Sequence, residues 1–330
     1  MKKVRNMTIT HPEFELQIGE EKFPTKGDGG LLGLEMGRNI GLPIDHLFLV
    51  LTNREYKFEK HSPVKLKLGY DGKLNQVFSG SLDTIEAEIS KVSINAIGQS
   101  KGLVDLRVNK LYQDQSAGSI VKDLLSEAKV EKHEIQDGIS FPLYVVDERH
   151  NGLEHIIKLG DRCGYDVYTT EEGKLAFKRF ETKKKSKLKF SVDVLGVEMK
   201  KRERFFESST IYGESPSSSK GAETFHWWTK EDIKATAGEG KAFVLNDPAI
   251  RSSENAEKVS KTMQEWVSYN QYLAVTTIGK PDIQIGHTVI LEGFSFPTMN
   301  NDYEVIGVEH YMSKPRGFTS RFACRRRGKP

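Results

Sequence analysis

The sequence predicts a mainly β, α+β protein, in which antiparallel strands form both ends and helices lie mostly in the middle. Three observations support this prediction. Apolar and polar residues alternate with a period of two in much of residues 1–107 and again after residue 187, which is typical of strands with one buried face. Between these regions the apolar residues recur at helical spacing. The longest apolar run, 47–51, is too short for a transmembrane helix, so no membrane association is expected.

The composition is that of an ordinary globular protein. The 330 residues include 49 Lys+Arg and 46 Asp+Glu, a net charge of +3, with 37% hydrophobic residues. This length predicts about two or three domains. Two cysteines, Cys163 and Cys324, exclude a disulfide-rich or zinc-stapled framework. The basic start at residues 1–3 is followed by no apolar stretch, so we expect no signal peptide and synthesis in the cytoplasm.

The first predicted domain, residues 1–107, consists of short strands. Val64, Leu66 and Leu68 alternate with lysines, and Asp71-Gly72 supplies a turn before Val77-Phe78, which is the pattern of a hairpin with one buried face. Further strands are predicted at 14–18, 47–51 and 92–96. An antiparallel sandwich or a small barrel would fit this pattern.

The second predicted domain, residues 108–182, is a small α+β unit. Apolar residues in 117–128 fall on one helix face, and Ser116 is placed to cap that helix. A second helix is expected to begin at Asn151, with Glu154 completing a capping box, and to end at Gly164. A hairpin is predicted to follow, with arms at 165–169 and 174–180.

The third predicted domain, residues 183–330, begins with a lysine-rich segment and returns to strands. Strands are expected at 188–194, 272–278, 289–291, 303–308 and 318–324, with an inserted helix at 253–268. The serine-rich segment 215–221 is typical of a surface loop. A loose repeat relates 66–70 to 290–294, since both strands end in glycine followed by an aromatic residue.

The sequence predicts no catalytic residues and no cofactor. The glycine-rich stretch 27–41 lacks the phosphate-binding patterns and a surrounding βαβ unit. No G-x-S-x-G elbow occurs, and two S-x-x-K matches, at 126–129 and 217–220, lack the motifs that accompany them in enzymes. No pair of carboxylates is singled out as an acid and a base.

No metal site and no specific nucleic acid binding are predicted either. His150 and His155 are five residues apart, whereas two zinc ligands on one helix face need a spacing of four. The basic runs 183–187 and 325–327 are short and have no aromatic residues interleaved to stack on bases. Trp227 and Trp228 are adjacent, so a strand would point them to opposite faces, which leaves both core burial and a protein interface open.

The order of these units resembles the late-control gene D family of phage tail proteins. A central run, Leu159-Gly160-Asp161-Arg162-Cys163-Gly164-Tyr165-Asp166, is part of the resemblance. The other matching segments are 98–103, 112–117, 120–125, 144–146, 172–177, 285–293 and 303–310. The resemblance covers nearly the whole chain, except the glycine-rich stretch before Leu42.

This resemblance implies a baseplate hub, the piece that joins the tail tube to the spike of a contractile tail and is related to the N-terminal part of type VI secretion spike proteins. Family members form homotrimers, with two tube-like β-barrels per subunit and an α+β unit attached. The expected partners are the tail tube, other baseplate proteins, the tape measure protein and, because the chain ends at Pro330, a separate spike protein. The expected location is the tail of a phage, tailocin or related particle.

The resemblance and the weak repeat together predict how subunits meet. Two barrels per chain in a trimer would present six similar surfaces to a six-fold tube. We therefore expect 1–107 and 183–330 to superpose and to alternate around a ring, with the middle unit outside it. Subunit or partner contacts are predicted at Val77, Phe78, Trp227, Trp228, Phe294 and Phe296. The alternative is a wall-degrading tail enzyme whose catalytic residues have no recognisable pattern.

Overall fold

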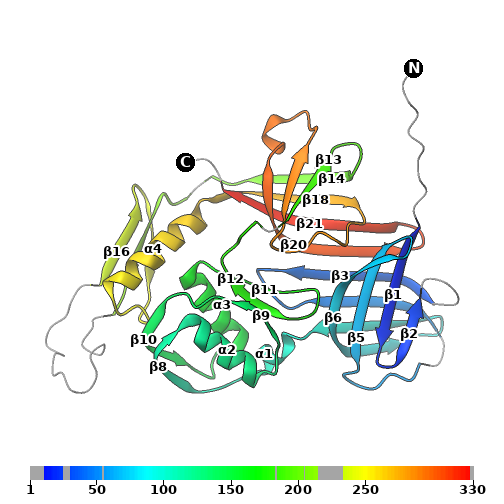
Figure 1. Cartoon of the computed structure of the whole chain (residues 1–330), viewed down its shortest axis with the longest axis horizontal. Coiled ribbons are helices and arrows are strands. Elements are labelled where there is room, and N and C mark those ends of the chain that lie inside the picture. The colour runs from blue at the N-terminus through cyan, green and yellow to red at the C-terminus, as the bar shows by residue number, and fades with distance from the viewer. Residues whose placement is uncertain are drawn as a thin grey trace.

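The chain is built around one long, mostly antiparallel sheet (Figure 1). Its structure is a computed structural model that describes residues 11–24, 30–53, 56–182, 184–203, 205–214 and 233–327. Thirteen strands belong to the long sheet, and three smaller sheets accompany the helices. The predicted mainly β, α+β class is therefore confirmed.

The N-terminal half of the long sheet curls around its own core. The predicted hairpin is present, because Asp71 and Gly72 both adopt positive φ, of 50° and 80°, as a tight two-residue turn requires. Leu16, Leu66 and Phe78 lie opposite one another on three neighbouring strands and are fully buried. The strands are β1 (Pro12–Ile18), β2 (Glu21–Pro24), β3 (Leu31–Asn39), β4 (His46–Thr52), β5 (Pro63–Tyr70), β6 (Lys73–Ala87) and β7 (Lys91–Gly98).

The C-terminal half of the sheet has a second, separate core. Val275, Val289 and Phe322 are among its fully buried members. Parallel pairing of β13 with β19, from Lys185↔Thr288 to Lys189↔Glu292, joins the lysine-rich run to this half of the sheet. The elements are β13 (Lys185–Lys189), β14 (Val194–Lys201), β18 (Tyr269–Ile278), β19 (Thr288–Glu292), the 3-10 helix η2 (Pro297–Met299), β20 (Asp302–Ser313) and β21 (Gly317–Arg327).

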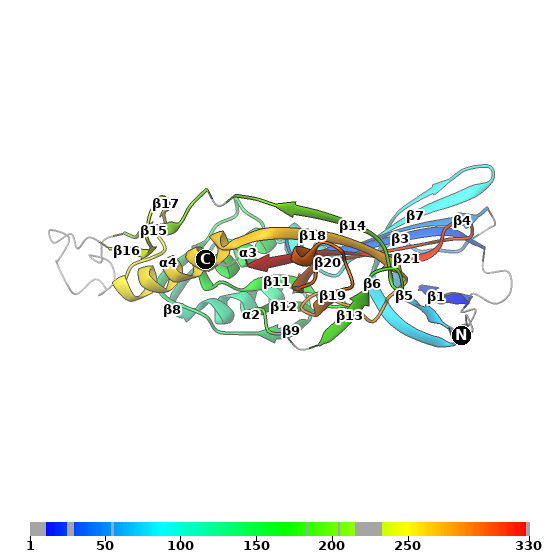
Figure 2. The same ribbon diagram turned by 90° about the horizontal axis from the view of Figure 1, so that it is seen from above.

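The two halves join through β3 and β20, which pair from Gly33↔Ser313 to Asn39↔Gly307. Strand pairing therefore runs without interruption from β14 to β2, in the order β14-β18-β21-β20-β3-β4-β7-β6-β5-β1-β2. Figure 2 shows the consequence, since strands of both halves extend along one direction of the elongated chain.

Beside the long sheet, the helices and the small sheets share a third core. It combines residues of the predicted middle domain with Ile211, Ile233 and Val259 from beyond residue 183. The first set of elements is α1 (Lys101–Asp105), β8 (Lys110–Ser116), α2 (Ala117–Glu127), β9 (Lys132–Ile135), β10 (Ser140–Val146), α3 (Gly152–Cys163), β11 (Asp166–Thr169) and β12 (Leu175–Lys178). The second set is β15 (Ser208–Tyr212), β16 (Lys234–Gly238), β17 (Ala242–Asn246) and α4 (Ser253–Val267). The domain boundaries at 107 and 182 stay a prediction, although this core includes residues from both sides of residue 183.

The predicted helix signals are confirmed at α2 and α3. The Ser116 hydroxyl accepts a hydrogen bond from the Ser119 amide, and Asn151 and Glu154 form a reciprocal capping box. Gly164 ends α3 in the left-handed region at φ 68°. Within the described part of the chain, no helix combines the length and the apolar character needed to span a membrane.

One predicted strand differs from the structure. The alternating apolar residues of 188–194 cross a turn between β13 and β14 instead of forming one strand. The turn places Ser191 at φ 60°, and the Asp193 carboxylate accepts the Lys189 amide hydrogen bond. The side chains of Phe190 and Val192 in this turn are consequently exposed to solvent, whereas in a continuous strand they would point into the core.

We predict that Leu124→Asp and Ile156→Asp each prevent stable folding. Both side chains are fully buried in the third core, so an aspartate there loses apolar burial and becomes an unpaired charge. The expected loss is about 4 kcal/mol or more of the free energy of unfolding, measured by denaturant titration. Ser126→Asp, on the exposed side of α2, is the control. A wild-type unfolding curve for either core variant would contradict the helix packing.

Candidate functional site

The long sheet has three open edges among the described residues, which are its candidate assembly surfaces. β14 pairs only with β18, β13 only with β19, and β2 only with β1. An unpaired strand edge presents free amide and carbonyl groups that can pair with another chain. The C-terminal half of the sheet thus contributes two edges and the N-terminal half one.

A group of apolar side chains, four of them exposed and Phe294 half-buried, lies close to the β14 edge. We name it the apolar tip and define it as Phe190, Val192, Leu195, Phe294 and Phe296. The Phe190 and Phe294 rings contact each other at 5.0 Å between centroids, which joins the β13–β14 turn to the segment after β19. Leu195 and Phe296 are 60% and 66% exposed. A cluster of this kind is typical of a surface that a partner covers.

The six residues predicted as contacts are placed very differently. Phe296 and Phe294 belong to the apolar tip. Val77 and Phe78 are buried in the N-terminal core, so their side chains face inward, away from any neighbour. Trp227 and Trp228, like the serine-rich segment 215–221, lie outside the described residues. The predicted interface at these positions stays a prediction.

Strand β11 connects the third core to both halves of the sheet through buried charges. At its C-terminal end the Thr169 hydroxyl donates to Asp45, whose other carboxylate oxygen accepts from Arg38 Nε at 2.9 Å. At its N-terminal end Asp166 accepts from Arg325 Nη2 at 2.7 Å. All of these residues are buried, so the three cores are connected where water cannot compete.

The Arg325 guanidinium is the most heavily contacted of these groups. Its Nε donates to Glu304 at 2.8 Å, and it lies over the Tyr269 ring at 4.4 Å from the centroid. These partners raise the pKa of Arg325, so its positive charge is permanent. For Asp166, burial raises the pKa, and the charge of Arg325 opposes that shift. Removing Arg325 would therefore leave buried carboxylates without a counter-charge.

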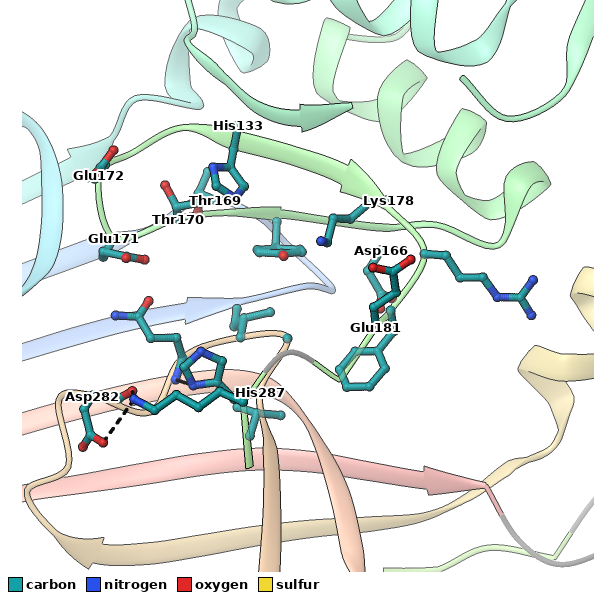
Figure 3. A pocket seen from close by; sticks show the side chains of 18 of the residues that line it. His133, Asp166, Thr169, Thr170, Glu171, Glu172, Lys178, Glu181, Asp282 and His287 are labelled. Carbon is teal, nitrogen blue, oxygen red and sulfur yellow. Dashed lines mark hydrogen bonds and ion pairs between the residues drawn. The ribbon is translucent and has the colours of Figure 1, made fainter. Parts of the chain in front are cut away.

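A polar cleft of about 430 Å³ lies beside β11, where the three parts of the chain meet (Figure 3). Its walls come from the β11–β12 hairpin, the segment 180–184 and the loop that carries Asp282 and His287. The cations on these walls are paired, Lys184 with Asp282 and Lys178 with Glu134. Burial lowers the pKa of His287, which keeps that ring neutral. The cleft therefore has the chemistry of a junction between folded units, with no positioned acid and base pair among the described residues.

The two cysteines are free thiols of low reactivity. Burial raises the pKa of Cys163 to about 11 and that of Cys324 further still. At neutral pH both are therefore protonated, whereas a catalytic cysteine requires the thiolate. Neither cysteine is therefore activated as a nucleophile.

The structure brings His150 and His155 together, contrary to the reasoning from helical spacing. His150 precedes the α3 cap residue Asn151, so only His155 is on the helix and the rule of four residues does not apply. Asp147 joins them, and one potential ligand atom from each residue lies within 4.8 Å of the others. Sequence reasoning missed this group because the backbone folds back before the helix begins.

The arrangement of the long sheet and third core is found in known structures. The 43 kDa tail protein of prophage MuSo2 from Shewanella oneidensis is similar over 95% of this chain and 98% of its own, with a TM-score of 0.72 and 14% identity. A tail protein from Neisseria meningitidis is similar over 96% and 97%, with a TM-score of 0.73 and 11% identity. This chain has the phage tail protein fold.

A third similar structure extends the likeness to secretion systems. The c3393 protein of E. coli, a component of the type VI secretion system with structural similarity to T4 tail proteins gp27 and gp5, matches over 89% of this chain and 73% of its own. Its TM-score is 0.60 and its identity 11%. Protein-family models and the sequences of curated proteins give no match. The predicted relationship to phage tail and secretion spike folds is therefore confirmed at the level of structure alone.

We predict that Arg325→Met destabilises the protein by about 3–5 kcal/mol, because it leaves the buried Asp166 and the partly buried Glu304 without their cation. The matched control is Arg321→Met on the same strand, since Arg321 is half exposed and its ion pair with Glu309 is at the surface. The free energy of unfolding of that control should fall by about 1 kcal/mol or less. Denaturant titration measures the free energy of unfolding of both variants. Equal losses would show that the buried cluster stabilises the protein no more than a surface ion pair does.

Proposed function

We propose that this protein is a structural baseplate hub of a contractile phage tail, a tailocin or a related injection system. In this role three copies form a ring that adapts the six-fold tail tube to a three-fold spike. The observation that carries the proposal is the fold shared with phage tail proteins over almost the whole chain. The likeness to a type VI secretion component, itself similar to gp27 and gp5, supports placement at the spike end of the tube.

The sheet provides the surfaces that such a ring needs. One half of the sheet ends in the β2 edge and the other in the β14 and β13 edges, so each copy offers different edges to its neighbours. A contact between different surfaces closes into a ring when the rotation between copies is right. The apolar tip beside β14 supplies buried area that edge pairing alone would lack.

The predicted partners follow from this role. The ring would contact the tail tube on one face and a spike protein on the other, with other baseplate proteins and the tape measure protein nearby. Synthesis in the bacterial host cytoplasm and assembly into the particle are part of the proposal. The proposed role includes no enzymatic activity. A peptidoglycan zymogram of the purified protein should therefore show no clearing.

We predict that the purified protein is a trimer at micromolar concentration and that Phe296→Glu combined with Leu195→Glu converts it to a monomer. Two carboxylates in the apolar tip would be buried without partners in the interface. Light scattering coupled to size exclusion measures the mass. Ile89→Glu is the matched control, because Ile89 is 99% exposed in the β6–β7 turn. A monomeric wild type would contradict the trimer, and a trimeric double variant would exclude the apolar tip as its interface.

A further inference from the structure

A compact group of nitrogen and oxygen donors lies where β10 leads into α3. The Asp147 Oδ1 and His150 Nδ1 atoms are 3.4 Å apart, and His155 Nε2 is 3.0 Å from the Asp147 carbonyl oxygen. His155 is buried, whereas His150 and Asp147 are partly exposed. Access is open from a cavity of about 330 Å³ that these three residues help to line.

The separation of Asp147 Oδ1 and His150 Nδ1 fits the coordination shell of a small divalent cation. Zinc binds imidazole nitrogen and carboxylate oxygen at about 2.0–2.1 Å, which sets neighbouring donors of a tetrahedral shell about 3.3 Å apart. These two ligand atoms, at 3.4 Å, are already close to that value. Only small side-chain rotations are needed, since all three ligand atoms are already within 4.8 Å of one another.

We propose that Asp147, His150 and His155 form a binding site for one zinc-class divalent cation. Two imidazoles and one carboxylate favour Zn²⁺, Co²⁺ or Ni²⁺ over Mg²⁺ and Ca²⁺, which prefer oxygen ligands. The cation takes the place of the His155 Nε2 proton, and the ring then carries its proton on Nδ1. The cavity leaves the remaining coordination position to water.

Four nearby cations set the strength of binding, and one of them, Arg251, is paired with Glu214. Arg149 pairs with both Asp147 oxygens, at 3.1 Å each, but its side chain is 82% exposed and can turn into solvent. Arg162 is held by Asp247 at 2.6 Å and is neutralised there. Lys158 lines the same cavity and repels a bound cation. Arg149 is therefore a competitor for the carboxylate, and its removal should strengthen metal binding.

The test uses full-length protein without a histidine tag, treated with EDTA and dialysed, and then titrated calorimetrically with ZnCl₂. We expect one zinc per chain with a dissociation constant in the micromolar range or below. His150→Ala should bind at least about tenfold more weakly, because it removes one of three ligands. His133→Ala, an exposed histidine on β9, is the matched control and should bind as the wild type does.

Two further measurements test the ligands of the site. Arg149→Ala should bind zinc more tightly than the wild type, and Co²⁺ should give the visible absorption of a nitrogen- and oxygen-ligated site. Equal weakening by His150→Ala and His133→Ala would overturn the site, as would no binding by the wild type. Unchanged affinity in Asp147→Asn would exclude Asp147 as a ligand. Because His155 is buried, its substitution is avoided, and circular dichroism checks that the other variants fold.

Discussion

The architecture depends on the buried charges at the two ends of β11. This strand has only four residues, all buried, yet Asp166 at one end is paired with Arg325 and Thr169 at the other end is bonded to Asp45. The first contact joins the third core to the C-terminal half of the sheet, and the second joins it to the N-terminal half. Charges buried in this way tolerate few arrangements, because each needs its partner at hydrogen-bond distance.

The continuous sheet and β11 hold different parts of the molecule in place relative to one another. The β3–β20 ladder fixes the two halves relative to each other, while β11 fixes the helical part relative to both. The unpaired strand edges and most of the apolar tip remain at the surface.

Much of the local structure could be predicted because the physical causes are local. Ser116 and Asn151 cap helices through atoms three residues away, and Gly164 and Gly72 take positive φ values where turns need them. The five-residue helix α1 and strands β15–β17 were not predicted. Their segments are short, and their burial comes from the third core instead of from a periodic pattern of their own.

The sequence by itself determined the fold class, the long helices and the main hairpins, because period and capping act within a few residues along the chain. Tertiary structure alone decided that β3 pairs with β20, that Ile211 and Val259 share a core with Leu124, and that Phe78 is buried while Phe296 is exposed. It also decided that Asp147, His150 and His155 meet. Each of these depends on which distant segment covers a given face, and no pattern within one segment specifies its partner.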